Sequence, residues 1–69
     1  MTDKAQALAY LTKALAMEIS ALTDSHSRVA SVLANDFASM AFNLGATDED
    51  IEHCKKAAVC AVEYLNQRA

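Results

Sequence analysis

Hydrophobic residues recur along this chain at every third or fourth position, which is the spacing of one face of an α-helix. Near the N-terminus they fall on two adjacent lines: Leu8, Leu11, Leu15, Ile19 and Leu22, and Ala7, Tyr10, Ala14, Met17 and Ala21. A stripe of this width is typical of a helix that packs against two neighbours. The pattern predicts a helix from about Asp3 to Leu22.

A helix boundary is predicted where the next apolar line ends, at Leu44. Gly45 is the single glycine of the chain, and it suits the left-handed position just after a helix C-terminus. Thr47 and Asp50 nearly match a capping box, with Asp in place of the usual Glu or Gln. The sequence therefore predicts a final helix from about Asp48 to Gln67. One side of it carries Ile51, Cys54, Ala58, Ala61, Val62 and Leu65.

The middle segment leaves two architectures open. Its apolar line is Val29, Leu33, Phe37, Met40 and Leu44, and this line stays in helical phase with the one that begins at Leu8. One helix from Asp3 to Leu44 would therefore keep a continuous apolar face. In contrast, Thr23 to Ser27 is a run of poor helix formers that begins with three good N-cap residues, which favours a loop.

The two alternatives imply different molecules. With a loop, the chain is a small all-α bundle of three helices. Without one, it is a long helix plus a short return helix, which has to pair as a dimeric bundle to cover its apolar face. Both are single domains spanning residues 1–69, since a chain of 69 residues is near the lower limit for one core.

Composition adds the expectation of a homodimer. Hydrophobic residues make up 54% of the chain, but aromatic residues only 6%, and many of the others are alanine. An alanine-rich core buries little area per residue, while each ordered residue costs about 1.5 kcal/mol of conformational entropy. Association is a common route to the missing stability, so we expect the chain to bind a second copy of itself.

Charge argues against two classes of partner. The net charge is −3, and the six basic residues are dispersed, whereas binders of nucleic acids and membrane surfaces usually concentrate positive charge. Lys13 and Glu18 interrupt the early hydrophobic run, so we expect no membrane span. Cys54 and Cys60 lie six positions apart in a predicted helix and cannot bridge there, so we interpret them as free thiols of a cytoplasmic protein.

The polar residues offer little catalytic chemistry. Glu18 and Asp36 lie on or beside apolar lines, where they either pair with a basic residue of the chain or receive a basic group of a partner. The stretch "HCKKAA", which begins at His53, resembles the motif of histidine phosphotransfer domains. This resemblance implies a phosphorelay carrier, and a metal carrier that uses His53 is a related alternative. We expect no enzyme, cofactor or metal site.

Phe42 is the main candidate for contact with another protein. It lies opposite the line formed by Val29, Leu33 and Met40, so it is either exposed for a partner or folded over the Gly45 turn onto the last helix. Tyr10, Met17 and Tyr64 flank their apolar lines and could extend the same surface. We therefore expect a small acidic protein-binding regulator or inhibitor, or alternatively an assembly module whose sole partner is itself.

Overall fold

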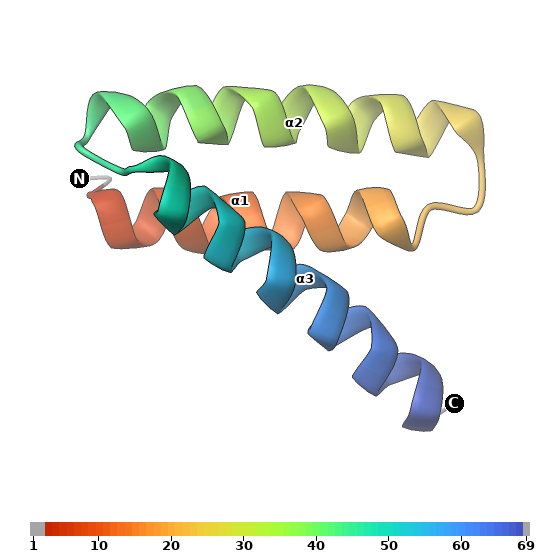
Figure 1. Ribbon diagram of the computed structural model, residues 1–69. Helices are drawn as coiled ribbons and strands as arrows, with labels where there is room; N and C mark the ends of the chain where they lie inside the picture. Colours follow the sequence, from red (N-terminus) through yellow and green to blue (C-terminus); the bar gives the residue numbers. More distant parts are fainter. Residues whose placement is uncertain (1–2, 69) are drawn as a thin grey trace.

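Three α-helices make up the fold in the computed structural model, which describes residues 3–68 (Figure 1). They are α1 (Lys4–Ile19), α2 (Asp24–Asn43) and α3 (Asp48–Arg68), and no strand occurs in the described residues. Helices α1 and α2 lie side by side and run antiparallel, whereas α3 crosses α1 diagonally. The prediction of a small three-helix bundle is confirmed.

A loop separates α1 from α2, so the alternative of one long helix is wrong. Thr23 is the N-cap of α2, and its hydroxyl accepts a hydrogen bond from the His26 N–H at 3.1 Å. The residues after this cap form the first turn of α2, so the connection is residues 20–23 and lies earlier than expected. Helix α1 also ends at Ile19 rather than Leu22. Leu22 is 95% exposed, so it does not extend the apolar line.

The turn between α2 and α3 follows the sequence prediction closely. Gly45 has φ +100°, and the hydrogen bonds from Ala46 N–H to Ala41 C=O (2.9 Å) and from Gly45 N–H to Phe42 C=O (3.0 Å) form a Schellman motif. The capping box is reciprocal: the Thr47 N–H donates to Asp50 Oδ2 at 3.0 Å, and the Asp50 N–H donates to Thr47 Oγ1 at 3.2 Å.

Alanine dominates the core. Leu11 is the one large side chain among the described residues that is fully buried. The other buried residues are Ala7, Ala14, Ala30, Ala34, Ala41, Ala46, Cys54 and Ala58. The buried line of α2 therefore consists of alanines rather than the expected Val29 and Met40, which are 56% and 39% exposed. Small side chains let two helix backbones approach closely, and the larger residues beside them then lie at the edge of the contact.

Helix α1 joins the other two helices. It packs extensively against both α2 and α3, while α2 and α3 barely contact each other. The α3 contact includes a hydrogen bond from Cys54 Sγ to the Leu8 carbonyl oxygen at 3.4 Å, and Ile51 packs against both small core clusters. Helix α3 thus covers one side of α1 and leaves the opposite side of the α1–α2 hairpin open.

Candidate functional site

The most prominent surface feature is the number of large apolar side chains that the fold leaves exposed. Twelve such side chains of the described residues are exposed, from 39% for Tyr10 and Met40 to 95% for Leu22. They come from all three helices, because each helix carries a wider apolar stripe than its contacts cover. Tyr10, Met17, Val29 and Met40 lie together on the α1–α2 hairpin, and Leu65 lies in a groove between α1 and α3. Both surfaces could receive another polypeptide.

What we call the hairpin face consists of four exposed residues, Tyr10, Met17, Val29 and Met40, and of the half-buried Leu33 and Phe37, which also pack against the core. Its centre is a stacked pair of rings, in which the centroids of Tyr10 and Phe37 lie 5.4 Å apart with 25° between the planes. The ammonium group of Lys13 lies 5.7 Å from the Tyr10 centroid. The Tyr10 hydroxyl also accepts a 3.4 Å hydrogen bond from Gln6 Nε2.

Helical geometry places the hairpin face on the side opposite α3. On α1, Tyr10 lies two residues from Leu8, which is about 200° of helical rotation, and Leu8 belongs to the α3 side. On α2, the successive positions Val29, Leu33, Phe37 and Met40 are three or four residues apart and share one side. Phe37 stacks on Tyr10, so this side of α2 is the side on which Tyr10 lies.

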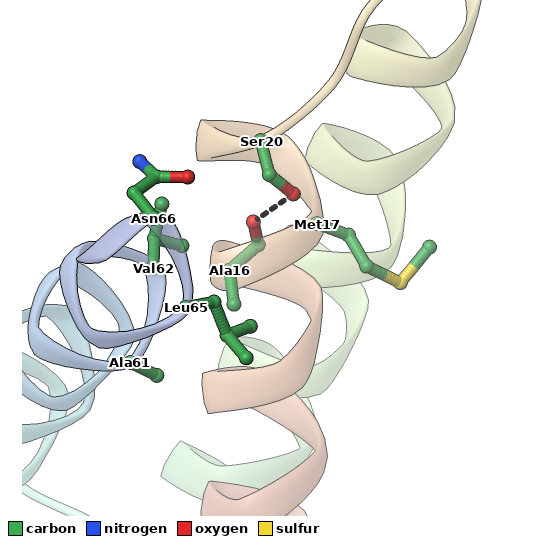
Figure 2. Close-up of a pocket in the computed structure, with 7 residues that line it drawn as sticks. All are labelled: Ala16, Met17, Ser20, Ala61, Val62, Leu65 and Asn66. Carbon is green, nitrogen blue, oxygen red and sulfur yellow. Dashed lines mark hydrogen bonds between the residues drawn. The ribbon is translucent and has the colours of Figure 1, made fainter. Parts of the chain in front are cut away.

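A second apolar surface is a groove between the C-terminal halves of α1 and α3, here called the α1–α3 groove (Figure 2). It encloses about 370 Å³ and is lined by Ala16, Met17, Ser20, Ala61, Val62, Leu65 and Asn66. Leu65 is 65% exposed and points toward α1, while Met17 points away from the α3 side chains. Ser20 is engaged locally, since its hydroxyl donates to the Ala16 carbonyl at 2.8 Å.

The structure brings together half of the residues predicted to bind a partner. Tyr10 and Met17 share the hairpin face, and Asp36 lies beside it, one turn from Leu33 and Met40. Glu18 is half-buried on α1, and Tyr64 is 55% exposed on α3. These two lie apart from that group.

Phe42 also lies outside the hairpin face. It is 45% exposed and does not belong to the side chains packed against either core cluster. On α2 it lies two residues from Met40, or about 200° of helical rotation, and so on the other side of the helix.

Sequence reasoning missed the importance of Phe37 and Leu65 at the surface. The apolar line of the middle segment predicts a buried Phe37, but this residue is half-buried and stacks on Tyr10. The spacing of the last helix predicts Leu65 on its packed side, but this residue is largely exposed. One signal in the sequence could have identified them. The alanines are small enough for close helix contacts, so the large apolar residues of the same stripe are left at the surface.

The polar candidates of the last helix are all near its surface. His53 is exposed, one turn after Glu49, and within residues 3–68 no group of three or more His, Cys, Asp or Glu residues is arranged to hold a metal ion. Cys60 is an exposed free thiol and Cys54 a buried one. The bond from the Thr47 backbone N–H lowers the pKa of the exposed Asp50 carboxyl below its ordinary value of 3.8.

No protein-family model, curated protein or solved structure matches the chain. None of the helices in the described residues combines the length and the apolar character needed to cross a membrane.

Proposed function

We propose that this protein is a small non-enzymatic regulator or inhibitor that binds another protein through a helical, partly apolar surface, and that it acts in the cytoplasm as a homodimer. The single observation that carries the proposal is the imbalance between core and surface. One large side chain is fully buried, whereas twelve are exposed, all counted over the described residues. Clustered apolar surface of this kind marks sites of protein contact.

The two apolar surfaces supply two places for contact. The α1–α3 groove has apolar walls from two helices, which is the form that receives the apolar side of a partner helix. The hairpin face is broader and flatter and carries aromatic and methionine side chains, which are enriched at protein interfaces. The free thiols of Cys54 and Cys60 fit a reducing cytoplasm, where disulfides are rare.

Affinity capture from the source organism tests the proposal. Baits are the wild-type chain, Leu65→Glu in the groove, and Val59→Glu as a control, because Val59 is also an exposed apolar residue of α3 (44%) but does not line the groove. We expect a protein that is retained by the wild type and the control but lost with Leu65→Glu, at unchanged helicity. Retention of the same proteins by all three baits, or of none, contradicts binding through the groove.

Phe42→Ala is a second variant for the same experiment. If Phe42 contacts a partner, the substitution weakens capture and leaves helicity and melting nearly unchanged, because its side chain is 45% exposed. A variant that unfolds instead assigns Phe42 to the core.

A further inference from the structure

We propose that the hairpin face binds a second copy of the same chain around a two-fold axis parallel to α1 and α2, with Lys13 of each copy against Asp36 of the other. This inference rests on the proposed function, because it names a second copy of the chain as the partner of the hairpin face.

The size of the face is sufficient for a modest interface. Helix α1 has 16 residues, so the paired part of the hairpin is about 24 Å long. Two helices side by side are about 20 Å wide. The face therefore covers roughly 500 Å² per copy, and two copies bury about 1,000 Å², which is the lower bound for a specific protein interface.

Near the middle of its length this face is bordered by two charged side chains of opposite sign, Lys13 and Asp36, while Arg28 lies beside Val29 and Leu33 at the end where α2 begins. Lys13 lies three residues from Tyr10 and four from Met17, so it shares their side of α1 and extends over the Tyr10 ring. Asp36 lies three residues from Leu33 and four from Met40, so it shares their side of α2. Lys13 is thus on the α1 edge and Asp36 on the α2 edge, and both are exposed.

The two charges also lie at nearly the same level along the hairpin. Tyr10 stacks on Phe37, Ala14 and Ala34 share one core cluster, and Ala7 and Ala41 share the other. This antiparallel register places Lys13 opposite residue 34 or 35 of α2. Asp36 is therefore displaced from Lys13 along the helix axis by about 3 Å or less.

This arrangement of charges distinguishes between the two simple symmetric pairings of the face. A two-fold axis parallel to the helices exchanges the α1 and α2 edges of the face but leaves every residue at the same position along the helix axes. Each Lys13 therefore meets Asp36 of the other copy. An axis across the helices instead stacks α1 on α1, and Lys13, which is near the middle of α1, then faces its own counterpart. Opposed like charges disfavour that second pairing.

The favoured pairing also matches helix directions and aromatic positions. Helix α1 of one copy lies on α2 of the other, so neighbouring helices run antiparallel as in a four-helix bundle. Because the axis keeps the level, the Tyr10–Phe37 pair of one copy meets the same pair of the other copy in one layer. Aromatic pairs in such a layer contribute beyond the area that they bury.

Charge reversal tests the pairing. Sedimentation equilibrium at low salt is measured for the wild type, Lys13→Glu, Asp36→Lys and the double variant, with helicity checked by circular dichroism. We expect each single reversal to raise the dimer dissociation constant about tenfold and the double variant to restore it. Lys56→Glu is the matched control: it makes the same charge change on an exposed residue of α3 and should leave the constant within about threefold.

These outcomes decide the pairing, whereas the capture experiment decides whether the chain binds another protein. Restoration by the double variant supports the pairing. A dimer whose dissociation constant is unchanged by the reversals, or is not restored by the double variant, overturns the pairing alone. A chain that stays monomeric at millimolar concentration overturns both the pairing and the homodimer of the proposed function. If a reversal unfolds the chain, Lys13→Gln and Asp36→Asn replace it, and each should weaken the dimer and reduce its salt dependence.

Discussion

Leu11 is expected to be the most sensitive position of the fold, because it is the one large side chain of the described residues that is fully buried, at 2% exposure. Substitution by alanine removes its apolar contacts and leaves a cavity between α1 and the residues around Ala34 and Cys54. Buried Leu→Ala changes cost about 2 to 5 kcal/mol. A chain of 69 residues has a total stability of about 3 to 10 kcal/mol.

Leu11→Ala should therefore lose about half of the stability or unfold the chain at 25 °C. The assay is urea unfolding followed by circular dichroism at 222 nm, at one protein concentration throughout because the stability of a chain that associates depends on its concentration. Leu22→Ala is the matched control: the same atoms are removed from a side chain that is 95% exposed, so the change should stay within about 0.5 kcal/mol. A Leu11→Ala variant within 1 kcal/mol of wild type would refute this description of the core.

Three further predictions concern the turn, the cap and the thiols. Gly45→Ala should destabilise the fold by about 1 kcal/mol in urea unfolding. The cause is backbone strain at φ +100° and not a clash, because no atom lies within 4 Å of the added Cβ. A stabilised variant contradicts this prediction. Asp50 has a lowered pKa, so its carboxylate stabilises the fold above its ordinary pKa and loses this effect as the pH falls through the lower folded value; Asp50→Asn should flatten the acid side of the stability curve. Cys60 should react with a thiol reagent in the folded chain much faster than Cys54, which is 7% exposed; equal rates, read by mass spectrometry, contradict the packing of α3 on α1.

Local signals were sufficient to predict the turn between α2 and α3. The Gly45 turn, the Thr47–Asp50 cap and the start of α3 all depend on residues within a few positions of one another, and the structure agrees with each prediction. The helical phase of the apolar line from Leu8 to Leu44 was misleading, because it suggested one continuous helix where the structure has a loop. Hydrophobic spacing reports the face of a helix and does not show whether the backbone continues, and the cap at Thr23 decided that question.

The hairpin face could not be predicted, because it depends on which apolar residues are too large for the core. Hydrophobicity alone ranks Val29 and Met40 above Ala30 and Ala41, yet the alanines are buried. The close approach of α1 and α2 selects for small side chains, which is a tertiary constraint without a local signature. The Tyr10–Phe37 stack likewise depends on the register of two helices.

Helix α3 is held mainly by α1, which makes the fold asymmetric. Both small core clusters join α1 and α2, whereas the buried residues of α3, Cys54 and Ala58, lie in the half that follows the Gly45 turn. Parts of a protein with few buried contacts open at low cost without global unfolding. Movement of the distal half of α3 would therefore change the width of the crevice beside Leu65 while the α1–α2 pair kept its shape.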